Sequence, residues 1–148
     1  MWDEEHSRYV ETKKLSNGQT VMMGFDLTDW NGDTNYWNIE LSVYNKRKDQ
    51  YSNMDKIVVT GGSPFESFAA AREMFHSLLY DVLNEYGGYD NVIYCSWVDN
   101  RRRDTYYKFL SKYGFTYTNL WGQKFLARKF KQGFEYGDLF KRYSNDKQ

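Results

Sequence analysis

The stretch from Asn91 to Phe115, NVIYCSWVDNRRRDTYYKFLSKYGF, combines a strand, a charged turn and an amphipathic helix in one run. At its start, both alternating sets of side chains are largely apolar, which is typical of a strand covered on two faces. Asp99 or Asn100 can cap the helix that follows, and Gly114 provides a left-handed residue to end it. The sequence therefore predicts a central strand over 91–97 and then a helix that stops at Gly114.

The end of this helix carries a resemblance to a known family. An arginine-bearing turn follows the buried strand, and the helix closes with an aliphatic-x-x-x-Gly-Phe phrase, Leu110 to Phe115. This combination resembles the last helix of the GNAT superfamily of N-acyltransferases. The resemblance implies a mixed sheet with one helix after its fourth strand and another after its fifth. In that family the two strands splay apart to hold acyl-CoA.

The rest of the chain is predicted to form a hairpin, further strands and a second long helix. Asn17-Gly18 between two extended segments is a strong hairpin signal. Residues 28–35 and 46–53 are expected to be loops because turn-forming and polar residues dominate them. Residues 1–7 are expected to fray and 131–148 to form a tail. The predicted strands are 8–15, 19–27, 36–44, 56–60, 91–97, 116–119 and 124–130, and the helices besides the one before Gly114 are 63–86 and a short one at 136–143.

The helix over 63–86 has the clearest end signals in the chain. Ser63 and Glu66 have the spacing of a capping box, Pro64 occupies the first helical position, and Gly87-Gly88 follows the last turn. Together these elements predict an α/β (α+β) fold, GNAT-like, with a mixed, mainly antiparallel sheet of about six to seven strands and two main helices.

Composition narrows the class of protein. A chain of 148 residues is expected to form a single domain, 1–148. The single Cys95 excludes an intramolecular disulfide framework, and the interrupted apolar runs predict no membrane span and no secretory leader, so we expect a cytoplasmic protein. The only histidines, His6 and His76, are far apart in sequence, so no metal site is expected.

The formal net charge of zero conceals two halves of opposite sign. Residues 1–100 contain 16 acidic and 8 basic side chains, whereas residues 101–148 contain 4 acidic and 12 basic ones. One interpretation is that two faces of one domain, or two chains of a homodimer, attract each other. The other is that the C-terminal third meets an anion, such as a nucleotide phosphate, a nucleic acid or an acidic protein.

The family resemblance implies a site for acetyl-CoA. In the family, the pantetheine pairs with the fourth strand, and the pyrophosphate rests on backbone N–H groups of the following loop and helix start. Glycines permit close backbone approach, and a helix N-terminus offers unpaired donors. The corresponding residues here are Val58, Val59, Thr60, Gly61, Gly62, Ser63 and Phe65, with Arg102 and Arg103 as candidates for the 3′-phosphate of CoA.

The resemblance also implies a general acid on the last helix. Many family members have a tyrosine four residues before the Gly-Phe glycine, but Leu110 stands there in this chain. Tyr106 and Tyr107, one turn earlier, can replace that tyrosine, or they are simply a packed ring and a surface ring. Glu40, on the wetter face of the strand over 36–44, is the candidate general base, or else an exposed strand glutamate.

Two functions therefore follow from the sequence. The first is an N-acetyltransferase that moves an acetyl group from acetyl-CoA to a small or protein amine by direct attack on the thioester. The second is a non-catalytic binding module of the same fold, whose basic and aromatic C-terminal third binds a protein or a nucleic acid. Arg101–Arg103 and the aromatic residues after them have the mixture found in single-stranded nucleic-acid binders, although Asp99 and Asp104 can also neutralise the arginines.

Overall fold

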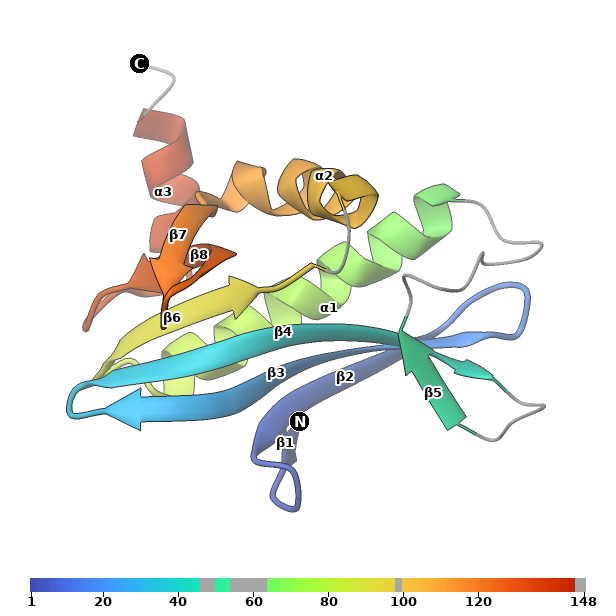
Figure 1. Cartoon of the computed structure of the whole chain (residues 1–148), viewed down its shortest axis with the longest axis horizontal. Helices are drawn as coiled ribbons and strands as arrows, with labels where there is room; N and C mark the ends of the chain where they lie inside the picture. Colours follow the sequence, from blue (N-terminus) through green and yellow to red (C-terminus); the bar gives the residue numbers. More distant parts are fainter. Residues whose placement is uncertain (46–49, 54–63, 98–99, 146–148) are drawn as a thin grey trace. The chain divides into compact units, whose positions relative to one another are not determined.

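The computed structural model describes residues 1–45, 50–53, 64–97 and 100–145 of the chain (Figure 1). The predicted strand at 56–60 lies outside the described residues. In chain order the elements are β1 (Trp2–Asp3), β2 (Arg8–Lys14), β3 (Thr20–Asn31), β4 (Thr34–Asn45), β5 (Gln50–Asn53), α1 (Pro64–Glu85), β6 (Asp90–Cys95), α2 (Asn100–Leu110), η2 (Ser111–Tyr113), β7 (Thr116–Leu120), β8 (Gln123–Phe130) and α3 (Asp138–Asn145).

The strands form one mixed sheet in the order β1-β2-β3-β4-β6-β8-β7, and β5 pairs with β4. The pairs β1·β2, β2·β3, β4·β5, β6·β8 and β7·β8 are antiparallel, while β4·β6 is parallel. A parallel pair needs a long crossover, and α1 lies in the connection from β4 to β6. The predicted class is therefore confirmed: the fold is α+β, with a mixed, mainly antiparallel sheet and two substantial helices.

The chain divides into two compact units. Unit 1 consists of Met1–Asp26 and Ile39–Leu79, and unit 2 consists of Leu27–Asn38 and Tyr80–Gln148. The strands β3 and β4 and the helix α1 each contribute residues to both units.

In unit 1, the β2–β3 hairpin forms as predicted. Gly18 has φ +86° and donates its N–H to the carbonyl of Leu15, and the N–H of Leu15 bonds to the carbonyl of Gln19. A left-handed residue at this turn is the reason that Asn17-Gly18 is such a strong hairpin signal. The hairpin packs on α1 through rings of Phe25 and Phe75 whose centroids are 5.8 Å apart.

The two predicted polar loops contain strand residues. β3 continues to Asn31 and β4 begins at Thr34, so only Gly32 and Asp33 turn the chain, with Gly32 at φ +60°. The predicted loop over 28–35 was wrong because its polar residues mark exposed strand ends rather than irregular backbone. The predicted loop over 46–53 was wrong in its second half, where β5 pairs with β4. Backbone pairing with a neighbouring strand overrides the polar composition of both segments.

The first residues are paired, although the sequence led us to expect fraying. Trp2 pairs with Tyr9, and Asp3 pairs with Arg8, in the β1·β2 ladder. The ring of Trp2 also meets the ring of Tyr9 edge-on at 4.9 Å. This short strand brings Asp3 to Arg8, which matters for the site described below.

In unit 2, the predicted central strand is β6. Its buried Asn91, only 1% exposed, accepts a hydrogen bond from the indole of Trp37 at 3.0 Å and donates to the carbonyls of Tyr86 and Tyr89 at 2.9 and 3.2 Å. A buried amide with one partner on β4 and two in the turn between α1 and β6 holds these segments together. Asn91 thus ties β6 to β4 and to the end of α1.

The end of the α2 segment also matches the sequence prediction. The helix tightens into the 3₁₀ turn η2, and Gly114 closes it with φ +81° and an N–H bonded to the carbonyl of Ser111. The next residue, Phe115, is 1% exposed and anchors the chain as it enters β7. A left-handed glycine followed by a buried aromatic residue is the physical content of the Gly-Phe phrase.

The C-terminal residues are attached to the rest of unit 2. Gly133 donates its N–H to the carbonyl of Gly87, and the N–H of Gln132 bonds to the carboxylate of Asp90 at 2.8 Å. The predicted short helix is α3, shifted by two residues toward the C-terminus.

Candidate functional site

Two carboxylates from neighbouring strands of unit 1, Asp26 on β3 and Glu40 on β4, form what we call the acid pair. Asp26 lies directly across the β2·β3 ladder from Arg8. Its neighbour Phe25 packs on α1, and side chains alternate between the faces of a strand, so Asp26 points to the face opposite α1. The acid pair therefore lies on the sheet face that α1 leaves uncovered in unit 1.

The acid pair holds a proton near neutral pH. Burial, followed by the hydrogen bond and the negative charge of Glu40, raises the pKa of Asp26 to about 7, against a lowering by the charges of Arg8 and His6. Oδ1 of Asp26 is buried and has no hydrogen-bond partner among the described residues. Two close carboxylates of which one is desolvated cannot both ionise readily, so burial and the neighbouring Glu40 favour the protonated form of Asp26.

The charge of Arg8 is only partly available to Asp26. Its guanidinium Nε donates to Asp3 at 3.1 Å, and the same carboxylate of Asp3 contacts Nδ1 of His6 at 2.8 Å. The hydrogen bond from His6, more than that from Arg8, lowers the pKa of Asp3. Asp3 therefore stays ionised and competes with Asp26 for Arg8, which helps to explain why an arginine next to Asp26 does not cancel its raised pKa.

Two small residues surround the acid pair. Gly24 leaves the space that a Cβ would fill 3.2 Å from Oδ1 of Asp26 and 3.6 Å from Cδ of Arg8. Ser42, two residues after Glu40 on β4, is 4% exposed, and its hydroxyl has no partner within the described part of the chain. By strand alternation Ser42 shares the face of Glu40. The site thus has unused buried hydrogen-bonding capacity at both Asp26 and Ser42.

The structure distributes the predicted catalytic residues over both units. Glu40 is exposed and lies in unit 1 beside Asp26. Tyr106 is half-buried, and Tyr107 is 43% exposed and stacked on Tyr117; both tyrosines belong to α2 in unit 2. The candidate base therefore has a titrating neighbour, whereas Tyr107 is a surface ring of the kind that the alternative interpretation expected.

The predicted cofactor residues fall mostly outside the described residues. This applies to Val58, Val59, Thr60, Gly61, Gly62 and Ser63. Phe65 lies in the first turn of α1 and Arg102 lies in α2, but the structure does not describe the side chain of either residue. Arg103 donates to Asp104 at 3.2 Å, so its charge is shared with a neighbouring carboxylate.

Glu66 tests whether a pyrophosphate fits the start of α1. Both of its carboxylate oxygens accept hydrogen bonds from Ser16, one from the backbone and one from the hydroxyl, and these bonds lower the pKa of Glu66. Glu66 therefore binds the β2–β3 turn and keeps its negative charge in the first helical turn. That charge opposes a second anion at the same helix end, so this part of the predicted cofactor site does not fit a pyrophosphate.

Sequence reasoning missed Asp26. It ends an otherwise apolar strand run, two residues after Gly24, and an isolated carboxylate in such a run is the signal that could have identified it. Its partner on β4 could not be paired with it because the predicted loop over 28–35 separated the two strands. Once β3 and β4 are seen as a hairpin, Asp26 and Glu40 become neighbours.

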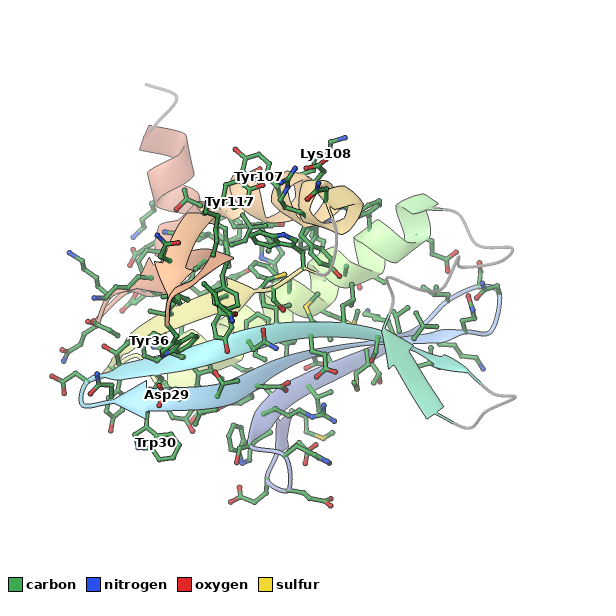
Figure 2. All side chains as sticks on the ribbon, viewed as in Figure 1. Asp29, Trp30, Tyr36, Tyr107, Lys108 and Tyr117 are labelled. Carbon is green, nitrogen blue, oxygen red and sulfur yellow. The ribbon has the colours of Figure 1, made fainter. Side chains whose placement is uncertain are left out.

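Unit 2 carries a different kind of surface, made of aromatic rings. Tyr107 of α2 and Tyr117 of β7 stack with centroids 5.4 Å apart and planes 7° apart, and Trp97 meets Tyr117 edge-on at 5.7 Å. Figure 2 labels this tyrosine pair together with Lys108, the residue after Tyr107. We call Trp97, Tyr107 and Tyr117 the stacking surface.

A second aromatic group in unit 2 lies around Trp121. This residue is 53% exposed and has φ +50° in the Trp121-Gly122 turn, a conformation that side chains other than glycine rarely adopt. Its ring meets those of Tyr36, Tyr94 and Phe125 at 5.0, 5.3 and 6.1 Å. These contacts offset the cost of the left-handed backbone, so Trp121 covers a small apolar cluster and is satisfied by packing.

Among the described residues, no group of three His, Cys, Asp or Glu side chains could hold a metal ion, and no helix is long and apolar enough to span a membrane. Cys95 lies buried within β6, and its thiol donates to the carbonyl of Ser96 at 3.4 Å.

Comparison with known proteins adds no relative: no family model, no curated protein and no solved structure matches this chain.

Proposed function

We propose that this chain is a GNAT-like N-acyltransferase that moves an acetyl group from acetyl-CoA to an amine, with the acid pair as its general base. The observation that carries the proposal is the raised pKa of Asp26 beside Glu40. A base is most effective when its pKa is close to the working pH, and Asp26, whose pKa is raised to about 7, meets that condition.

The chemistry of the acceptor explains why a base is needed. An amine is largely protonated at neutral pH and must lose a proton before its lone pair can attack a thioester. The exposed Glu40 can accept that proton, and the neighbouring Asp26 can then hold it. The negative charge of the deprotonated pair also attracts the ammonium form of the substrate before proton transfer.

The order of strands in unit 2 supports the family part of the proposal. The parallel neighbour of β6 is β4, paired over Thr34–Asn38 and Asp90–Tyr94, and β8 and β7 follow on the other side of β6. In chain order α1 precedes β6 and α2 follows it.

The donor side needs its own test because Glu66 does not fit a pyrophosphate. Calorimetric titration of the full chain with acetyl-CoA and with free CoA measures it directly. A Kd below about 1 mM for either, weakened at least about tenfold in Gly62→Glu, supports a CoA donor. Absence of binding to both rejects the acetyl-CoA-dependent activity.

The acceptor side is tested by thiol release with acetyl-CoA and a panel of polyamines, lysine peptides and amino sugars. We expect Glu40→Gln to reduce kcat/KM by about 100-fold or more, because it removes the exposed proton acceptor and the negative charge that helps to raise the pKa of Asp26. Glu85→Gln, at an exposed glutamate of α1, is the matched control. Equal rates for Glu40→Gln and the unmodified chain on an accepted amine would reject the acid pair as the base.

A further inference from the structure

The stacking surface of unit 2 contains two exposed tyrosine rings that lie nearly parallel. Tyr107 and Tyr117 are each 43% exposed although they stack on each other almost in parallel. Trp97 extends the group beyond Tyr117. Rings that pack only to fill a core are usually covered, so the two exposed tyrosines beside the half-buried Trp97 offer aromatic surface to a ligand.

Positive charge surrounds these rings. Arg103 lies one helical turn before Tyr107 on the same face of α2. In the β7·β8 ladder, Tyr117 pairs with Leu126 and Asn119 pairs with Lys124, so Lys124 shares the face of Tyr117. Across the whole segment 100–130 the sequence has eight basic side chains and one acidic side chain, Asp104.

We propose that the stacking surface binds single-stranded nucleic acid, with bases stacked on Tyr107 and Tyr117 and phosphates held by Arg103 and Lys124. This activity is independent of the acid pair in unit 1 and of any acyl transfer. Base faces stack on aromatic side chains without sequence preference, and Lys and Arg neutralise the backbone.

The same observations favour nucleic acid over an acidic protein. Carboxylate side chains satisfy the positive charges but have no flat faces for the tyrosine rings. A single-stranded nucleic acid presents a planar ring and a negative charge at every residue, which suits the rings on α2 and β7 beside the cations on α2 and β8.

The test uses the full chain and labelled oligo(dT) and oligo(U) of about 12 nucleotides, followed by fluorescence anisotropy from about 50 to 200 mM salt. We expect binding to at least one of them, with an affinity that falls linearly with the logarithm of the salt concentration. Comparison of the two oligomers tells DNA from RNA. Duplex DNA of the same length is expected to bind more weakly because its bases are not free to stack.

Two sets of variants separate stacking from charge. Tyr107→Leu and Tyr117→Leu are each expected to weaken binding by about tenfold without changing the salt dependence. Arg103→Gln and Lys124→Gln are each expected to reduce the slope of the salt dependence by about one. Tyr89→Leu, an exposed tyrosine after α1, and Lys141→Gln, an exposed lysine of α3, are the matched controls and are expected to bind normally.

Three results would overturn the proposal. One is the absence of salt-dependent binding of either oligomer to the folded, unmodified chain at about 50 mM salt. Another is an equal loss in Tyr89→Leu and Tyr117→Leu. The third is binding of polyglutamate as tight as that of the oligomers, because a surface that recognises only charge is one for an acidic protein. Tyr117→Phe keeps the ring, so normal binding by this variant guards against a misfolded Tyr117→Leu.

Discussion

The two units bury polar side chains in opposite ways. In unit 2, the amide of Asn91 is completely enclosed and bonds to Trp37, Tyr86 and Tyr89. In unit 1, Oδ1 of Asp26 and the hydroxyl of Ser42 are buried without partners among the described residues. Buried polar atoms are nearly always satisfied, so the first arrangement is the rule and the second needs an explanation.

This difference separates a structural role from a functional one. A satisfied amide stabilises the fold and has no capacity left for a ligand. An unsatisfied carboxylate with a raised pKa costs stability, and such a cost persists where the group binds or transfers a proton. The contrast leads us to expect that mutations at Asn91 destabilise the protein and that mutations at Asp26 and Ser42 do not.

The largest effect is expected for Asn91→Ala. Removal of the amide breaks its hydrogen bonds to the Trp37 indole N–H and to the carbonyls of Tyr86 and Tyr89 in the core of unit 2. We expect a loss of about 2–4 kcal/mol in the free energy of unfolding, measured by urea denaturation. Asn84→Ala, an exposed asparagine of α1, is the matched control and is expected to have little effect. A loss below about 0.5 kcal/mol would show that Asn91 is not the structural centre we describe.

The second effect, of opposite sign, is expected for Asp26→Asn and depends on pH. Because the folded state raises the pKa of Asp26 from 3.8 to about 7, the folded protein binds more protons than the unfolded chain between these values. Below about pH 4, Asp26 is protonated in both states and does not lower the free energy of unfolding. As the pH rises through 7, the buried carboxyl ionises in the folded protein, and the free energy of unfolding declines. The amide cannot ionise, so the variant escapes this decline.

We expect Asp26→Asn to be more stable than the unmodified chain by about 1–2 kcal/mol at about pH 8, an amount already reduced for the solvent screening of a half-buried group. Near pH 4 the difference should be close to zero. Urea denaturation at the two pH values gives both numbers, and Asp33→Asn at the exposed β3–β4 turn is the control. Destabilisation of Asp26→Asn at the higher pH would show that the ionised carboxylate is satisfied in solution.

The sequence predicted the elements with strong end signals. The Asn17-Gly18 hairpin and the stop at Gly114 were identified because each depends on a left-handed glycine. The helix α1 was identified from its apolar pattern and the residues at its two ends, although Ser63 of the predicted capping box lies outside the described residues and Glu66 bonds to Ser16 instead. The acid pair could not be predicted in the same way. It depends on the β3·β4 contact, and the polar residues between these strands pointed to a loop where the structure has a two-residue turn.

Only one of the two carboxylates of the candidate site was therefore predicted from the sequence. Glu40 was identified from the wetter face of its strand, while Asp26 needed the pairing of strands and the burial of one oxygen to become noticeable. The stack of Tyr107 on Tyr117 likewise joins a helix to a strand that composition alone does not place together. What the sequence could not supply in both cases is contact between neighbouring elements, which sets pKa values and ring geometry.

The smallest effect is expected for Ser42→Ala, and it tests the comparison most directly. The hydroxyl of Ser42 is buried without a partner, so its removal ends a desolvation cost and leaves no other group unsatisfied. We expect a change in the free energy of unfolding between zero and a gain of about 1 kcal/mol, in contrast to the loss for Asn91→Ala. The matched control is Ser77→Ala, whose hydroxyl donates to Glu11 at 3.1 Å and whose loss should be slightly destabilising. If Ser42→Ala instead costs about 1 kcal/mol or more, its hydroxyl is satisfied in solution, and Ser42 then belongs with Asn91 as a structural residue rather than with Asp26.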